Sequence, residues 1–405
     1  MFGVDFLLKV SSFILLPFYL AYMSQDEFGL YSYMFVMVSS TTLFLSLGFH
    51  VSQMKLFHSF SKTEEKKSFL FTINTSLLFI SAILFFTIYY FNLDYFLINF
   101  LVDENINYES YRPFFLGLIF LSIFSLMQYS FFITNQNLTL VKLYNILKLI
   151  FVNGVVLYFL ASLNTDSVLI RFKYSFIVEL IIFLSLSYFF LKNFKIKFKL
   201  NHLKKILKIG LPIMLSSLVM IFYGLSDRFF LEKYYDLDLL GQYSLGVTFC
   251  SIIPLSMASF HTVFSPIIFK EDNNKKNFVV TNKIARICSL IYLIIGFCLI
   301  LALYFLIELN LIDNSYFNVI FFMPIMIIGA IFFSLSQLYQ LIITNLERTD
   351  FSLLFNILST LICIVCCFLF VPDYAAYGAA SSVMLATLTS FLLHFYYIKY
   401  KLNML

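Results

Sequence analysis

The sequence Asp26-Glu-Phe-Gly29-Leu-Tyr31-Ser32 recurs 212 residues later as Asp238-Leu-Leu-Gly241-Gln-Tyr243-Ser244, and both copies follow the pattern D-x-x-G-x-Y-S. Two further matches keep almost the same spacing: Ile133-Thr-Asn135 recurs as Ile343-Thr-Asn345, and Asn145-Ile-Leu147 recurs as Asn356-Ile-Leu358. One short match would arise by chance. Three matches at nearly one spacing indicate that the chain contains an internal duplication.

The composition is that of a membrane protein with many spans. Hydrophobic residues make up 61% of the 405 residues and charged residues 12%, against about 45–50% and about 25% in soluble globular proteins. Because a transmembrane helix needs about 20 apolar residues, the chain has material for about twelve spans and little left for a soluble domain. The net charge of +5 is too small, and the lysines too scattered, for a nucleic-acid partner.

Two kinds of chemistry find no support in the motifs. The stretch Cys363-Ile-Val-Cys366-Cys367 resembles a CxxC redox or zinc motif, but it lies in an apolar run with no second ligand pair. We therefore interpret these cysteines as small packing residues and expect no metal site. The sequence contains no G-x-x-x-x-G-K-[ST] motif, so we do not expect the chain to hydrolyse ATP.

Apolar runs between polar breaks predict twelve transmembrane segments. They are approximately 2–23, 29–49, 68–91, 113–133, 139–161, 168–191, 206–230, 241–268, 284–307, 316–342, 351–371 and 375–398. Clusters of lysine and arginine follow the even-numbered segments, whereas the odd-numbered connections are acidic. The positive-inside rule places the basic side, and with it both termini, in the cytoplasm.

Each half contains six segments, an even number, so both halves have the same orientation. We therefore predict an all-α membrane protein whose twelve transmembrane helices form two parallel six-helix repeats around a central cavity. The N-terminal six-helix lobe would comprise residues 1–191, a basic cytoplasmic linker residues 192–205, and the C-terminal six-helix lobe residues 206–405. We expect the basic loop from Lys192 to Lys208 to anchor the topology and to contact anionic lipids.

The order and spacing of several motifs resemble one known family. The chain is similar, over most of its length, to the Wzx-type polysaccharide or O-antigen flippases of the MOP exporter superfamily. The stretches that carry this resemblance are Leu15-Leu-Pro17, Ser24-Gln-Asp-Glu27-Phe-Gly29-Leu-Tyr31, Leu47-Gly48-Phe49, Lys55-Leu-Phe57-His58, Gly210-Leu-Pro212, Ser226-Asp-Arg228-Phe229, Leu240-Gly241-Gln-Tyr243-Ser244 and Pro266-Ile-Ile-Phe-Lys270.

This resemblance implies a two-lobed bundle in the bacterial cytoplasmic membrane that opens alternately to the two sides. It would flip an undecaprenyl-pyrophosphate-linked oligosaccharide from the inner to the outer leaflet, for the synthesis of a surface polysaccharide such as O-antigen. A proton or sodium gradient, or the flux of substrate, would drive the movement, and no cofactor is expected. The expected partners are the lipid-linked oligosaccharide, membrane lipids and the polysaccharide polymerase machinery.

Glu179 is the main candidate for ion coupling, because it lies near the middle of the sixth predicted segment. A charge there is costly unless it faces the protein interior or water. Glu179 is interpreted either as the carboxylate that couples transport to an ion or as the structural partner of a nearby cation. Arg171 lies two helical turns earlier on roughly the same face and is a candidate for contact with substrate.

Three further sites could contact substrate or ions. Asp5 and Lys9 lie one turn apart in the first segment, as an ion pair at the cytoplasmic mouth or at the interface. Lys148 lies about two turns inside the fifth segment, where it either lines the lumen or snorkels to the interface. Asp227 and Arg228 lie near the outer end of the seventh segment, as a structural pair, a rim contact or a substrate contact.

Two other functions remain open. A cation-coupled small-molecule exporter of the same superfamily would need a compact lobe cavity lined by acidic and aromatic residues. A membrane-bound polysaccharide polymerase or glycosyltransferase would need a large outer loop, and the longest outer connection here is residues 92–112. The internal duplication and the short loops favour transport over an enzyme.

Overall fold

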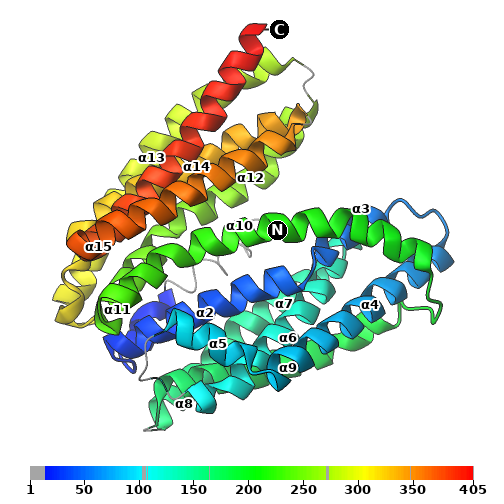
Figure 1. Cartoon of the computed structure of the whole chain (residues 1–405), viewed down its shortest axis with the longest axis horizontal. Helices are drawn as coiled ribbons and strands as arrows, with labels where there is room; N and C mark the ends of the chain where they lie inside the picture. Colours follow the sequence, from blue (N-terminus) through cyan, green and yellow to red (C-terminus); the bar gives the residue numbers. More distant parts are fainter. Residues whose placement is uncertain are drawn as a thin grey trace. The chain divides into compact units, whose positions relative to one another are not determined.

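The computed structural model describes residues 14–404 apart from 103–105, 107, 164, 271–272 and 347. These residues are almost entirely helical, and Figure 1 shows the course of the chain. The elements are α2 (Gln25–Leu45), α3 (Phe49–Phe57), α4 (Thr63–Tyr90), α5 (Leu93–Leu101), α6 (Tyr108–Thr134), α7 (Leu138–Leu147), the π-helix η1 (Lys148–Val152), α8 (Asn153–Ser162), α9 (Ser167–Leu191), α10 (Leu200–Tyr234), α11 (Leu237–Cys250), α12 (Ile252–Lys270), α13 (Asn274–Glu308), the short helix η2 (Asn314–Tyr316), α14 (Val319–Asn345) and α15 (Thr349–Met404).

Within the described residues, ten helices are long and apolar enough to cross a membrane. Every predicted segment from 29–49 onward falls on one of them, and α7, η1 and α8 together form one of the ten. The protein is thus an all-helical, multi-pass membrane protein. The first predicted segment, 2–23, lies mostly outside the described residues, and so do Asp5 and Lys9.

Asparagine and aspartate side chains set the starts of several helices. Asp236 accepts a hydrogen bond from the backbone N–H of Leu239 at 3.0 Å, and Asp166 caps α9 in the same way. Asn137 and Asn273 cap α7 and α13. Such caps satisfy backbone donors that the first helical turn leaves unpaired. A short polar residue can therefore end one connection and start the next apolar helix.

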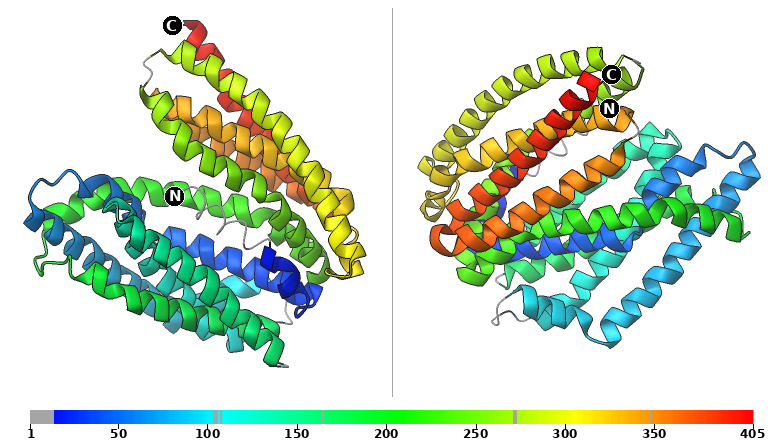
Figure 2. Two further views of the ribbon diagram at one scale, coloured as in Figure 1. Left: turned by 180° about the vertical axis from the view of Figure 1, so that it is seen from behind. Right: turned by 45° about the horizontal axis from the view of Figure 1, so that its top comes forward.

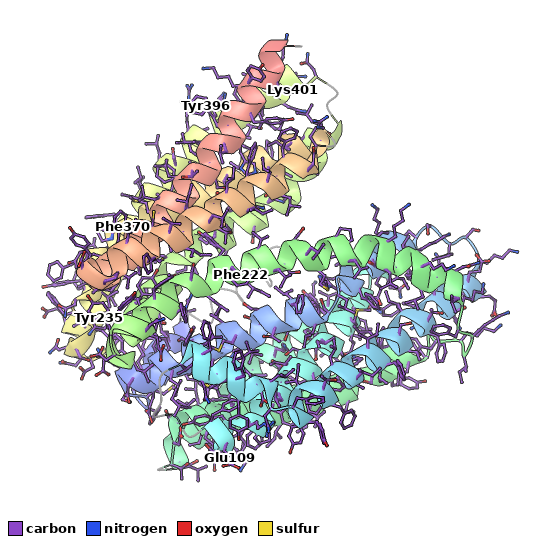
Figure 3. The ribbon with its side chains drawn as sticks, viewed as in Figure 1. Glu109, Phe222, Tyr235, Phe370, Tyr396 and Lys401 are labelled. Atoms are coloured by element: carbon purple, nitrogen blue, oxygen red, sulfur yellow. The ribbon has the colours of Figure 1, made fainter. Side chains whose placement is uncertain are left out.

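The range of α15 covers the last two predicted segments. The chain reverses direction between them, near Ala375, where φ is 50° and ψ is −128°. The Phe351 ring stacks on Tyr397 with centroids 4.5 Å apart, and Phe355 meets His394 at 5.2 Å. These pairs show that the two arms run antiparallel. In Figure 3 Phe370 lies near the bend, whereas Tyr396 and Lys401 lie towards the other end of the second arm. The break predicted between 371 and 375 is confirmed.

The starts of the helices recur along the chain at the spacing of the sequence repeat. Helices α6 and α14 are both 27 residues long, and they end at Thr134 and Asn345, within the repeated Ile-Thr-Asn motif. Helix starts 211 or 212 residues apart are Gln25 and Leu237, Thr63 and Asn274, Tyr108 and Val319, and Leu138 and Thr349. The duplication in sequence is therefore accompanied by a matching order of helices.

Contacts divide the chain into two compact units. Among the described residues, unit 1 comprises Met34–Ile221, and unit 2 comprises the residues before Met34 together with those from Phe222 onward. Both boundaries fall inside a helix, in α2 and in α10. In unit 1, α6 packs against α3 and α9. In unit 2, α14 packs against α13 and α15, and the helices α13, α14 and α15 lie side by side in both views of Figure 2. The division into lobes 1–191 and 206–405 stays a prediction.

The two copies of the D-x-x-G-x-Y-S motif pack against each other in unit 2. A Cβ atom on Gly29 would meet the carbonyl oxygen of Leu237 and would lie 2.7 Å from the backbone nitrogen of Gly241. A Cβ atom on Gly241 would meet the carbonyl oxygen of Gln25. Leu237 and Gln25 are themselves 212 residues apart, so the two contacts are reciprocal, as expected about a local two-fold axis. Glycine lets the backbones of α2 and α11 touch.

Replacing Gly241 by alanine should destabilise the protein by about 1–3 kcal/mol, because the new methyl group has to displace backbone rather than a flexible side chain. The midpoint of thermal unfolding of the purified protein in detergent measures this effect. Gly154→Ala is the matched control, since a Cβ atom there meets no described atom within 4 Å. Equal midpoints for the two variants would contradict the close approach of α2 and α11.

Candidate functional site

A charged pair lies in the middle of the helices of unit 1. Glu179 is the central residue of α9, about 18 Å from either end at 1.5 Å per residue. Lys148 opens the π-helix η1, near the middle of the span formed by α7, η1 and α8. Short π-helical insertions in α-helices often coincide with functional sites.

Lys148 and Glu179 form an ion pair, with 3.0 Å between Nζ and Oε1. The side chain of Lys148 is 35% exposed and that of Glu179 16% exposed, so the amine is the more accessible partner. The second carboxylate oxygen of Glu179, Oε2, is buried and accepts no hydrogen bond from the described residues. An isolated charge at the bilayer centre costs about 2.5–3.5 kcal/mol on insertion scales, and pairing reduces this cost.

Aromatic and amide groups surround this pair. The Tyr144 ring lies 5.4 Å from the Lys148 Nζ, and it packs against Tyr129 with 5.0 Å between ring centroids. The amide of Asn145 donates a hydrogen bond to the Tyr129 hydroxyl at 3.4 Å. We call Lys148, Glu179, Tyr129, Tyr144 and Asn145 together the mid-membrane cluster. Its hydroxyl, amide and aromatic groups are of the kinds that bind sugars.

The ion pair bears on the alternatives that the sequence leaves open for Lys148 and Glu179. The amine of Lys148 lies against Glu179 near the middle of the two helices, an arrangement that favours the interior interpretation of Lys148 over snorkelling. Glu179 has the nearby cation that a structural interpretation requires, but its free oxygen also leaves room for ion coupling. Arg171 is partly buried, eight residues before Glu179 and about 12 Å away along the helix axis. Roles of these residues in the lumen stay predictions.

A second group of buried charges lies in unit 2. Tyr243, from the second copy of the repeated motif, donates a hydrogen bond to Asp227 Oδ2 at 2.8 Å. Arg228 donates to the carbonyl oxygen of Gly224 at 3.1 Å and lies 3.7 Å from Asp227 Oδ1. The side chains of Asp227 and Arg228 are only 9% and 11% exposed. Both residues are therefore largely covered by the protein, and a role in binding substrate stays a prediction.

Two more polar residues belong to this buried group. Tyr33 is fully buried and lies within electrostatic range of Glu232, Arg228 and Asp227. Glu232 is also buried, one helical turn after Arg228. The predicted seventh segment ends at residue 230, which leaves Glu232 in the acidic connection that follows. The local sequence could not reveal its burial, because the nearby Tyr33 comes from α2, about 200 residues earlier in the chain.

Sequence reasoning also missed a polar network at one end of unit 1. Arg112 donates to Asp94 Oδ2 at 2.7 Å, to Asn92 Oδ1 at 2.9 Å and to the carbonyl oxygen of Tyr89 at 3.0 Å. Its guanidinium lies between the rings of Tyr89 and Tyr95, 4.4 and 4.6 Å from their centroids. The signal that could have found it was a single arginine in a connection whose other charged residues, Asp94 among them, are acidic. Arg112 joins α4, α5 and α6.

Arg112→Ala should lower the free energy of unfolding by about 2–3 kcal/mol, since it leaves the buried Asp94 carboxylate without its cation. Thermal unfolding in detergent provides the measurement. Arg348→Ala is the control, because Arg348 pairs with Asp350 at the surface, where both side chains are about half exposed or more. We expect almost no change for this control, as for most surface ion pairs. Similar losses for both variants would contradict the assigned network.

The fold is similar to that of solved structures of MOP superfamily transporters. The structure is similar to that of the lipid II flippase MurJ in an inward closed conformation, with a TM-score of 0.77 and 14% identity over 98% of this chain and 87% of that chain. It is also similar to an inward-facing multidrug resistance MATE family transporter, with a TM-score of 0.75 and 11% identity over 98% and 94% of the two chains. A MOP superfamily transporter from Pyrococcus furiosus gives a TM-score of 0.56 and 14% identity over 99% and 94%.

The sequence itself identifies the family. Residues 2–272, about two thirds of the chain, match the model of the polysaccharide biosynthesis protein family, and the chain belongs to this family. No curated protein matches the sequence.

Proposed function

We propose that this protein is a Wzx-type flippase, which moves undecaprenyl-pyrophosphate-linked oligosaccharide units from the inner to the outer leaflet of the bacterial cytoplasmic membrane. The observation that carries the proposal is membership of a polysaccharide biosynthesis family by a chain with the fold of membrane transporters. One protein with this fold is a flippase for lipid II, which supports a lipid-linked substrate here as well. The product would serve O-antigen or another surface polysaccharide, together with the polymerase machinery.

The proposed architecture has twelve transmembrane helices in two parallel six-helix repeats around a central cavity, with both termini in the cytoplasm. The recurrence of helix starts at 211 or 212 residues supports the two repeats. The reciprocal contact of Gly29 and Gly241 supports a two-fold relation between them. Alternating access would then follow from movement of one repeat against the other.

In the proposed mechanism, the pyrophosphate competes with Glu179 for Lys148. Two unit charges 4 Å apart attract by about 4 kcal/mol at an effective dielectric constant of 20, so a pyrophosphate carrying more than one charge outcompetes a single carboxylate. The released Glu179 would then take up a proton or a sodium ion. Arg171 and the Asp227–Arg228 pair are further candidates for substrate contact, as are Lys9 and Asp5 at the cytoplasmic mouth.

Glu179→Gln should abolish export of the polysaccharide while the amount of protein in the membrane stays normal, because glutamine keeps the shape of the side chain but cannot carry the coupled charge. Surface glycan and protein level are measured together. Glu308→Gln is the control: this carboxylate is exposed at the end of α13, where Oε1 accepts a hydrogen bond from Tyr304. Normal export by Glu179→Gln would remove the coupling role.

A double variant separates coupling from structure. If Glu179 serves only to neutralise Lys148, removing both charges in Lys148→Gln with Glu179→Gln should restore the export that either single change loses. If Glu179 couples ions and Lys148 binds pyrophosphate, the double variant should stay below about a tenth of wild-type export, since coupled residues that act directly are not rescued by removing each other.

Deletion of the gene, followed by mass spectrometry of undecaprenyl-linked intermediates, tests the function as a whole. We expect loss of surface polymer and accumulation of complete repeat units on the cytoplasmic face. An unchanged glycan would support the cation-coupled small-molecule exporter, which the likeness to a MATE transporter keeps as a second candidate. Complete units that are exposed outside but not polymerised would indicate a polymerase.

A further inference from the structure

The connection between α9 and α10 is held in a defined conformation against α4. We call residues 194–200 the interfacial finger; Figure 1 shows it in green beside the start of α4. Backbone and side-chain hydrogen bonds attach it along two turns of that helix. They are Lys195 N–H to Lys67 O at 3.3 Å, Ser68 Oγ to Lys197 O at 2.9 Å, and Lys199 N–H to Thr72 Oγ1 at 3.1 Å. An ion pair between Lys195 and Glu64 adds to these contacts.

The finger exposes apolar side chains at its tip. The backbone N–H of Lys197 donates to the carbonyl oxygen of Lys195 at 2.6 Å and closes a tight turn with Ile196 at its centre. Ile196 is 89% exposed, the highest value among the large apolar residues of the described chain, and Phe198 and Leu200 are exposed as well. Because the backbone is hydrogen-bonded to α4, this exposure belongs to a structured segment.

The surroundings of the finger are strongly basic. Residues 61–67 and 192–208 contain ten lysines and two glutamates. One of the glutamates, Glu64, is already paired with Lys195. The exposed lysines around the finger are Lys62, Lys192, Lys195, Lys197, Lys204, Lys205 and Lys208. The finger therefore combines an apolar tip with many exposed lysines in the segments that flank it.

The finger also lies at the level of the membrane surface. The membrane-spanning helix α9 ends at Leu191, just before the finger, and α10 begins at Leu200. The third helix in contact with it, α4, begins at Thr63. Three candidate spans thus start or end within a few residues of the finger, where lipid headgroups would lie.

We propose that the interfacial finger is a binding site for anionic phospholipid headgroups, with Ile196 inserted at the boundary of headgroups and acyl chains. Apolar side chains gain free energy at this boundary, and each lysine near an anionic surface adds attraction. An acidic protein would neutralise the lysines but leave the apolar tip in an aqueous interface. The proposal stands apart from the proposed function, since it does not depend on what the protein transports.

The absence of tryptophan from the sequence allows a direct test. In the full chain reconstituted into phosphatidylcholine vesicles, Ile196→Trp places the only tryptophan of the chain at the tip of the finger, where it can be excited at wavelengths that the 27 tyrosines do not absorb. Equal mole fractions of brominated phosphatidylglycerol or brominated phosphatidylcholine then act as quenchers. We expect phosphatidylglycerol to quench at least about twofold more strongly, owing to the lysines. Phe198→Trp is a second reporter should the first variant fail to fold.

Two controls define the outcome. Phe91→Trp, at the other end of α4, should show no preference for phosphatidylglycerol. Adding Lys197→Gln, Lys204→Gln and Lys205→Gln to the Ile196→Trp chain should lower the preference for phosphatidylglycerol, while phosphatidylcholine still quenches. Absence of quenching by either lipid would place the tip in water and overturn the proposal. An equal response to both lipids in the chain with its lysines intact would overturn the anionic specificity.

Discussion

The contact of two glycines is the constraint on which the arrangement of unit 2 depends. Gly29 and Gly241 allow the first turns of α2 and α11 to meet backbone to backbone, and each helix contributes the same positions to the contact. In a membrane, where apolar side chains gain nothing by leaving lipid for protein, such close packing is a main source of association between helices. The motif that reveals the duplication in the sequence is thus the motif that brings its two copies together.

The charged clusters depart from this repeated scaffold. At a spacing of 211 residues, Lys148 and Glu179 correspond to Ser359 and Ser390, whose side chains cannot carry charge. Ser359 simply donates to the carbonyl oxygen of Phe355 at 2.8 Å. The scaffold is duplicated, but the mid-membrane charges belong to one copy only. Since burying charges costs stability, we interpret these departures as the places where function overrides the repeat.

The sequence allowed the fold to be predicted further than the site. Long apolar runs separated by caps such as Asp166 and Asp236 are local signals, so the positions of the helices follow from composition and periodicity. Glu179 stood out because one carboxylate in an apolar segment is conspicuous. Its pairing with Lys148 was not predictable, because the register between two apolar helices is set by packing. The same reason explains the missed contact of Arg112 with Asp94.

Transport of a lipid-linked sugar in a purified system tests the central claim most directly. The protein would be reconstituted into vesicles that contain undecaprenyl-pyrophosphate-linked oligosaccharide, and a membrane-impermeant glycosidase would report the fraction exposed outside. The account predicts that the protein makes sugar from the inner leaflet accessible, and that pyrophosphate-linked lipid moves faster than the same oligosaccharide on an uncharged lipid. If the protein leaves the inner pool protected while it moves small organic cations, the account is contradicted.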